Sequence, residues 1–213
     1  MSPRVLAVDT THEYGSLALD DVVVPLHAPS GFAHVLYPHL RELLDRGGVR
    51  LAEVDCFAAA SGPGSFTGVR VGLACIKGLA EAARKPAVAV SNLEALASLG
   101  AAPLRAVLLD ARRGEIYGAV YDARGRIVVP ETVGSLAQWL ATLPAGELEF
   151  ISTDFAAFGE ALPGAPRVTA PRALAGAVAR IAAARFARGE ACDPAALDAN
   201  YVRRSDAELF WKE

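Results

Sequence analysis

The sequence has few cysteines, no excess of positive charge and no long apolar run, and each shortage excludes a class of protein. Its three cysteines, Cys56, Cys75 and Cys192, lie far apart and form no CxxC motif. This spacing argues against a disulfide framework and a thiolate metal site, and it is typical of a reducing cytosol. No stretch approaches the roughly 18 apolar residues of a membrane span. Asp9 interrupts the apolar N-terminal run, so we expect neither a signal peptide nor a membrane partner.

The net charge of −3 argues against a strongly basic protein that clamps nucleic acid. Hydrophobic residues make up 53% of the chain and charged residues 21%, which is typical of a globular protein that buries enough apolar surface to fold. A length of 213 residues allows one large domain or two lobes of about 100 residues each. We expect a cytoplasmic protein.

Strand patterns alternate with helical patterns, which predicts an α/β fold. The first half reads as a meander of three short strands and a helix over residues 34–46, followed by two strand–helix pairs, whose helices cover residues 69–84 and 93 to about 99. The second half loosely repeats this order and ends with an alanine-rich helix over residues 172–188. We interpret residues 100–103 as the connection between an N-terminal lobe, 1–102, and a C-terminal lobe, 103–213, whose tail can pack back on the first lobe.

The most informative segment joins a buried strand to the second helix. It reads Ser61-Gly62-Pro63-Gly64-Ser65-Phe66-Thr67-Gly68, with Arg70 following. The glycines permit unusual backbone angles, and Ser65 and Thr67 are helix-capping residue types, so the segment suits either an anion site or a capped strand-to-helix turn. It lacks the Gly-Lys-Ser/Thr of a Walker loop, and its glycine spacing is one residue too long for a dinucleotide fingerprint.

A second candidate site lies at the end of the first strand, in Asp9-Thr10-Thr11. In sugar kinases, actin and chaperone ATPases, an aspartate at this place within Asp-x-Gly-Thr/Ser helps to hold metal and phosphate. Here Thr11 replaces the glycine that lets phosphate approach. The segment is therefore either a vestigial nucleotide site or a turn in which Asp9 makes local hydrogen bonds.

One side of the second helix carries small residues at Gly68, Gly72 and Cys75, with Leu79 next in line. Glycine inside a helix costs about 1 kcal/mol relative to alanine. Close approach of another backbone would compensate for this cost, and that backbone is either internal or part of a second subunit. The first helix has a comparable stripe, Leu36, Leu40 and Leu43.

No residue set predicts a metal site, a cofactor or a nucleophilic triad. His34 and His39 are five residues apart, which places them about 140° apart around a helix and is unsuitable for a shared metal ion. A charged cluster at Asp110, Arg112, Arg113 and Glu115 suits an exposed turn, although a polar site is an alternative. Arg112, Arg113, Arg203 and Arg204 are interpreted as solvated charge rather than as RNA contacts.

Together these segments resemble the TsaB (YeaZ) family. The resemblance covers nearly the whole chain and rests above all on the string SGPGSFTGVRVGLACIKGLA. It also includes LAVDTT near the N-terminus, His34 with Pro38, SNLEALA, LDARRGEIY and the terminal NYVRRSDAE. The GPGSFTG-x-R-x-G pattern is highly specific.

The resemblance implies an actin-like (ASKHA, ribonuclease H-like) fold of two lobes with mixed sheets flanked by helices. It also implies a non-catalytic subunit of tRNA threonylcarbamoyladenosine synthesis. Such a subunit forms a heterodimer with the catalytic homologue TsaD through its two first-lobe helices, is joined by the ATPase TsaE, forms a homodimer when alone, and meets tRNA only indirectly. The expected interface is Leu36, Leu40, Leu43, Gly68, Gly72, Cys75 and Leu79.

Two enzymatic alternatives remain open. A nucleotide-dependent phosphotransferase or ATPase would use Asp9 and the 61–68 loop, with Ser65, Thr67 and Arg70. A metallopeptidase would need a set of metal ligands that the sequence does not offer.

Overall fold

The computed structural model describes residues 2–28, 30–159 and 161–203, which form two compact units. The first unit contains the chain up to Asn92 together with Arg172–Asn200. The second contains Leu93–Pro171 and the described residues from Tyr201 onward. The sequence placed the boundary between residues 102 and 103. In the structure the first division falls earlier, after Asn92, and a later stretch of chain returns to the first unit.

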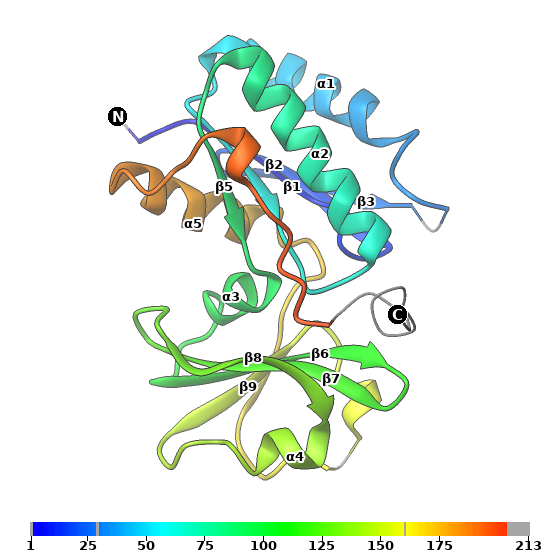
Figure 1. Cartoon of the computed structure of the whole chain (residues 1–213), viewed down its shortest axis with the longest axis vertical. Coiled ribbons are helices and arrows are strands. Elements are labelled where there is room, and N and C mark those ends of the chain that lie inside the picture. Colours follow the sequence, from blue (N-terminus) through cyan, green and yellow to red (C-terminus); the bar gives the residue numbers. More distant parts are fainter. Residues whose placement is uncertain (1, 29, 160, 204–213) are drawn as a thin grey trace, which may run out of the picture. The chain divides into compact units, whose positions relative to one another are not determined.

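The first unit is built on a mixed five-stranded sheet with the order β3-β2-β1-β4-β5. The central strand β1 pairs antiparallel with β2 and parallel with β4. The strands are β1 (Val5–Asp9), β2 (Tyr14–Leu19), β3 (Val22–His27), β4 (Cys56–Ala60) and β5 (Ala87–Val90). The helices, labelled in Figure 1, are α1 (Leu36–Gly47), α2 (Phe66–Ala83) and α5 (Ala175–Ala187), and α3 (Asn92–Ala97) begins at the division between the units. Single 3₁₀ turns occur at Leu51–Glu53 and Pro194–Ala196.

The two faces of this sheet differ in side-chain size. Side chains alternate along a strand, and Leu6 and Val8 of β1 join the apolar core that α1 and α2 cover. Ala7, between them, faces the opposite side, where the alanine-rich α5 contacts β1, β2 and β4. A Cβ at Gly176 of α5 would lie 2.8 Å from Val23 of β3. Small residues on this face therefore allow α5 to lie close to the strands.

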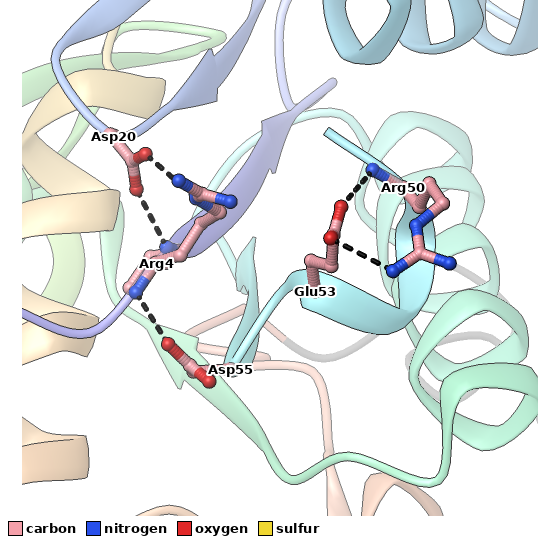
Figure 2. Close-up of polar contacts among 6 residues, drawn as sticks. Arg4, Asp20, Arg50, Glu53 and Asp55 are labelled. Carbon is pink, nitrogen blue, oxygen red and sulfur yellow. Dashed lines mark hydrogen bonds and ion pairs between the residues drawn. The ribbon is translucent and has the colours of Figure 1, made fainter. Parts of the chain in front are cut away.

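Two aspartates hold the start of β1 (Figure 2). Asp55 accepts a hydrogen bond from the Arg4 backbone N–H at 2.9 Å, and Asp20 accepts one from the Val5 N–H at 3.1 Å. The Arg4 guanidinium also lies 3.4 Å from the Asp20 carboxylate. These contacts satisfy backbone donors at the end of the strand opposite to Asp9.

The second unit repeats the strand arrangement of the first. Its sheet has the order β10-β9-β6-β7-β8, with β6 central, antiparallel to β7 and parallel to β9. The loose repetition seen in the sequence is thus a shared topology, and the predicted α/β class with two mixed sheets flanked by helices is confirmed. The strands are β6 (Leu104–Arg112), β7 (Glu115–Asp122), β8 (Ile127–Ser135), β9 (Leu148–Ser152) and β10 (Arg167–Thr169).

The helices of the second unit are much shorter. Between β8 and β9 lies α4 (Leu136–Leu140), and between β9 and β10 the described residues form a single 3₁₀ turn, Ala156–Phe158. Trp139 of α4 covers Gly118 of β7, where an added Cβ would lie 2.6 Å from the indole ring. The expected connection at residues 100–103 belongs to this unit, and the buried Glu149 accepts a hydrogen bond from the Ala102 N–H at 2.8 Å.

Element boundaries depart from the sequence predictions where a cap or an edge position decides them. α2 begins at Phe66 rather than Val69, because Ser65 caps it. The edge strand β8 continues through Pro130, a residue that edge strands tolerate. The three-residue β10 was not predicted. Within the described part of the chain, no helix has the length and apolar character needed to cross a membrane.

Candidate functional site

Asp9 lies fully buried at the carboxyl end of β1. Its Oδ1 accepts two hydrogen bonds from Thr11, one from the backbone N–H at 2.9 Å and one from Oγ1 at 2.7 Å. Its Oδ2 is buried, and no described residue donates to it. Asp9 therefore makes the local turn contacts that one of the two sequence interpretations predicted.

The family-motif loop packs directly on the residues that follow Asp9. The Ser65 N–H donates to the Thr11 carbonyl at 2.7 Å. An added Cβ at Gly64 would lie 2.6 Å from the Thr11 carbonyl oxygen and 2.8 Å from Thr11 Cβ. Only glycine allows this close approach of the loop. Thr11, which stands where the nucleotide-binding motif has glycine, thus contacts the loop through its carbonyl oxygen and Cβ.

Asn92, which is not among the site residues expected from the sequence, connects the loop to the end of β1. Its Oδ1 accepts from the Gly62 N–H at 3.0 Å, and its Nδ2 donates to Thr11 Oγ1 at 2.6 Å. Its own N–H donates to the Gly62 carbonyl at 2.8 Å. The only sequence signal was the capping pattern Ser91-Asn92, which places the residue at a helix start but gives no tertiary partner.

The start of α2 has the geometry of a capped turn. Ser65 Oγ accepts from the Gly68 N–H at 3.3 Å. Pro63 follows a cis peptide bond from Gly62. Thr67 and Arg70 are exposed, and the Arg70 guanidinium lies 3.7 Å from the centre of the Phe66 ring. The loop therefore positions the helix, as the second interpretation of this segment predicted.

The small residues of α2 face the protein's own interior. A Cβ at Gly68 would lie 2.0 Å from the Thr10 carbonyl oxygen, and one at Gly72 would lie 2.6 Å from Thr10 Oγ1. Thr10 Oγ1 donates to the Gly68 carbonyl at 2.7 Å. The neighbour that compensates for these helical glycines is internal: it is the end of β1.

This packing changes which residues are available for an interface. Six of the seven residues expected to meet a partner are buried in the first unit, and Leu79 is half-buried; the six are Leu36, Leu40, Leu43, Gly68, Gly72 and Cys75. The physical reason is that the apolar stripes of α1 and α2 cover the sheet. A partner would therefore meet the opposite sides of these helices.

The outward side of α2 carries residues four positions apart, which form one ridge along the helix. We call these residues the outer ridge: Phe66, Arg70, Ala74, Gly78 and Ala82, all exposed. On α1, Tyr37 is 58% exposed and interacts with Cys75 of α2. Two exposed aromatic side chains therefore lie on the outward sides of adjacent helices.

The buried thiols of the first unit have the character of core residues. Burial raises the pKa of Cys56 to about 12 and that of Cys75 to about 11, and the hydrogen bond with Tyr37 opposes part of the second shift. A raised pKa keeps each group in the unreactive thiol form at neutral pH.

His34 and His39 do not converge on a shared ligand site. His34 is exposed, and His39 Nδ1 lies 2.8 Å from the Val35 carbonyl on its own helix. Among the described residues, no group of three or more His, Cys, Asp or Glu side chains is placed to hold a metal ion.

The arginines considered for RNA contact have different surroundings. Arg112 ends β6 and Arg113 begins the turn to β7; both are exposed and have positive φ angles, 61° and 57°. Arg203 is engaged within the second unit: it donates to the Ala111 carbonyl at 2.9 Å and pairs with Glu115. Arg203 is therefore not freely solvated, which differs from the interpretation of this arginine as solvated charge. Arg204 lies outside the described residues.

A family model described as "TsaD: tRNA N6-adenosine threonylcarbamoyltransferase" matches residues 16–185. The "tRNA threonylcarbamoyladenosine biosynthesis protein TsaB" of Escherichia coli K12 is 38% identical over 128 residues, covering 56% of this chain and 55% of that protein. The protein of the same description from Bacillus subtilis is 33% identical over 149 residues, covering 65% of each. The matches thus span about half to two thirds of these curated relatives.

Solved structures match over a greater length. "YeaZ from Pseudomonas aeruginosa" has a TM-score of 0.81 at 30% identity, covering 93% of this chain and 99% of that chain. Another Pseudomonas aeruginosa structure, described as an uncharacterized protein "with similarity to peptidase YEAZ", has a TM-score of 0.84 at 31% identity, covering 94% and 100%. At these identities the likeness supports relationship as well as fold.

Proposed function

The chain belongs to the TsaD-related family of tRNA threonylcarbamoyladenosine biosynthesis proteins, in its TsaB (YeaZ) group, and has the actin-like fold of that group. From this premise we propose that it is a non-catalytic subunit that binds a TsaD homologue and activates threonylcarbamoyl transfer to adenosine of tRNA. Its role in threonylcarbamoyladenosine biosynthesis follows from the family, whereas the assignment of catalysis to the TsaD homologue and of binding and activation to this chain is our proposal.

The observation that carries this proposal is the contact between Gly64 and Thr11. The loop fills the space beside the end of β1, where an actin-like enzyme would admit a phosphate. This contact supports a subunit that contributes through an interaction rather than through chemistry of its own.

The outer ridge and Tyr37 form the surface best suited to that interaction. Phe66 is 40% exposed and Tyr37 58% exposed, and large aromatic side chains of this kind anchor protein interfaces. Ala74, Gly78 and Ala82 are small, so a partner helix can approach closely. Arg70 supplies one positive charge that complements a carboxylate on the partner. We propose that the TsaD homologue and a second copy of this chain compete for this surface, and that TsaE joins the heterodimer.

Sedimentation of the chain alone and with the TsaD homologue from the same genome tests the proposal. We expect a homodimer alone and a one-to-one heterodimer in the mixture. Gly78→Arg should abolish both, because a Cβ at Gly78 meets nothing within 4 Å and the long side chain blocks the ridge without disturbing the fold. Gly72 is unsuitable for this test because its side faces Thr10.

The matched control is Gly164→Arg, which makes the same change at another exposed position with open space in the second unit. It should assemble as the unaltered chain does. Heterodimer formation by Gly78→Arg at unchanged affinity would contradict the proposed surface, and a chain that ignores the TsaD homologue would contradict the proposed function.

A second candidate function, a nucleotide-dependent phosphotransferase or ATPase, is favoured by one observation: the buried Asp9 Oδ2 has no hydrogen-bond donor among the described residues. It would use Asp9 with Ser65, Thr67 and Arg70. Calorimetry with ATP and Mg²⁺ tests it. Micromolar binding that is lost in Asp9→Ala would favour this candidate over the first.

A further inference from the structure

We propose that Asp9 acts in this chain as the terminal acceptor of a directional hydrogen-bond chain, which sets the 61–68 loop and so presents the outer ridge to a partner. Asp9 and Asn92 are then positioning residues for docking, although both are fully buried. The docking part of this inference rests on the proposed function, whereas the hydrogen-bond chain itself does not.

The direction of the chain follows from which groups can donate. The Gly62 N–H donates to Asn92 Oδ1 at 3.0 Å, and Asn92 Nδ2 donates to Thr11 Oγ1 at 2.6 Å. Thr11 Oγ1 has a single hydrogen, which it donates to Asp9 Oδ1 at 2.7 Å. Each group accepts from one side and donates to the other, and the chain ends on a carboxylate oxygen. Hydrogen bonds to an ionised acceptor are stronger than neutral ones, so Asp9 strengthens the last link.

The same residues also set the first turn of α2. The Thr11 carbonyl accepts from the Ser65 N–H, and Thr10 Oγ1 donates to the Gly68 carbonyl at 2.7 Å. Gly68 would clash with Thr10 if it carried a Cβ, so the helix has no freedom to move inward. The position of Thr10-Thr11 therefore fixes where α2 begins, and Phe66 and Arg70 of the outer ridge lie in its first turns.

Asn92 is the residue of the hydrogen-bond chain whose amide must both accept and donate a hydrogen bond. Its amide accepts from Gly62 and donates to Thr11, whereas a carboxylate of the same shape accepts only. Asn92→Asp would remove the donor to Thr11 Oγ1 and add a second carboxylate to a buried chain that already ends on Asp9. Asp9→Asn keeps an oxygen acceptor for both hydrogen bonds from Thr11. The double variant exchanges the two residue types. Because the Thr11 N–H and Oγ1 both donate to one oxygen of residue 9, the amide oxygen of Asp9→Asn stays in that place. With the charge at position 9 removed, a protonated carboxyl group at position 92 can donate to Thr11 Oγ1, which restores the chain in its original direction.

A double-mutant cycle tests this direction. We expect Asn92→Asp to lower the melting temperature by on the order of 10 °C, the loss typical of a broken buried polar network. Amide exchange at Gly62 should accelerate by at least about tenfold, because losing the link from residue 92 to Thr11 lets the loop and residue 92 open together, although Gly62 keeps its own acceptor. Asp9→Asn alone should cost a few degrees. The double variant should recover most of what Asn92→Asp loses, in melting temperature and in Gly62 protection. Losses that simply add in the double variant would overturn the directional chain.

Affinity for the TsaD homologue, measured well below every melting temperature, tests the docking part. Asn92→Asp should bind at least about tenfold more weakly, and the double variant close to the unaltered chain. If Asn92→Asp loses Gly62 protection yet binds with unchanged affinity, the presentation of the ridge is overturned. If the unaltered chain does not bind the TsaD homologue, the proposed function and the docking part both fail, and the cycle still decides whether the hydrogen-bond chain exists.

Discussion

The inward and outward sides of α2 use the same small residue types for opposite purposes. Gly68 and Gly72 face the end of β1, where a single added carbon would overlap Thr10. Gly78 lies on the outer ridge, where an added Cβ meets nothing within 4 Å. A run of small residues along a helix therefore does not by itself identify an interface, because the same pattern serves internal packing.

The two units show a similar contrast. Their sheets share one strand topology, yet α1 and α2 have 12 and 18 residues, whereas α4 and the 3₁₀ turn at the corresponding places have 5 and 3. Long helices both cover a sheet face and leave an outward side for a partner. The shorter pieces of the second unit cover their sheet mainly through large side chains such as Trp139.

The largest expected effect is on the inward side. Gly68→Ala should lower the free energy of unfolding by about 3 kcal/mol or more, because the new Cβ would lie 2.0 Å from a backbone oxygen that cannot move without shifting β1. Urea denaturation measures this change. Stability equal to that of the unaltered chain would show that α2 is not in close contact with Thr10.

On the outward side, the expected loss is in binding rather than folding. Phe66→Ala and Tyr37→Ala should each weaken the complex with the TsaD homologue by about 2 kcal/mol, or roughly thirtyfold, as for an aromatic anchor. Ile127→Ala is the matched control, since Ile127 is 58% exposed on β8 in the second unit. An equal loss in all three variants would argue against a localised surface.

A smaller effect separates the glycines of the same helix. Gly78→Ala should stabilise the chain by about 1 kcal/mol, because alanine has the higher helix propensity and the position has room for a methyl group. The measurement is the melting temperature of Gly78→Ala, compared with those of Gly68→Ala and the unaltered chain. Destabilisation by Gly78→Ala would mean that the outer ridge is packed against other parts of the chain.

The smallest effect belongs to an exposed ion pair, in contrast to the buried network at Asp9. The Arg50 side chain and backbone hold the pKa of Glu53 at about 2, below its ordinary value of 4.5 (Figure 2). A lowered pKa in the folded state contributes stability above pH 4.5 that is lost as the pH falls through about 2. Glu53→Gln should therefore lower the melting temperature slightly at pH 7, and this difference should shrink as the pH falls toward 2 and vanish below it. A difference that stays undiminished at low pH would assign Glu53 another role.

Much of the fold and part of the site could be predicted from the sequence. Periodicity located the helices near their observed places, and Ser65 with Gly64 indicated a capped turn. The same periodicity did not reveal which stripe of α2 faces outward, since Gly72 and Gly78 are the same residue type and differ only in their tertiary neighbours. Asn92 was missed because its partners, Gly62 and Thr11, are 30 and 81 residues away.

The sequence by itself determined the α/β class and the family, because these depend on residue order and local spacing. Only the tertiary structure decided that Thr10 and Thr11 fill the space against α2 and its loop, and that the expected interface residues are core. The physical reason is that burial and steric contact arise between segments distant along the chain. A glycine's role depends on what lies within 3 Å of its missing side chain, and only the folded chain places that neighbour.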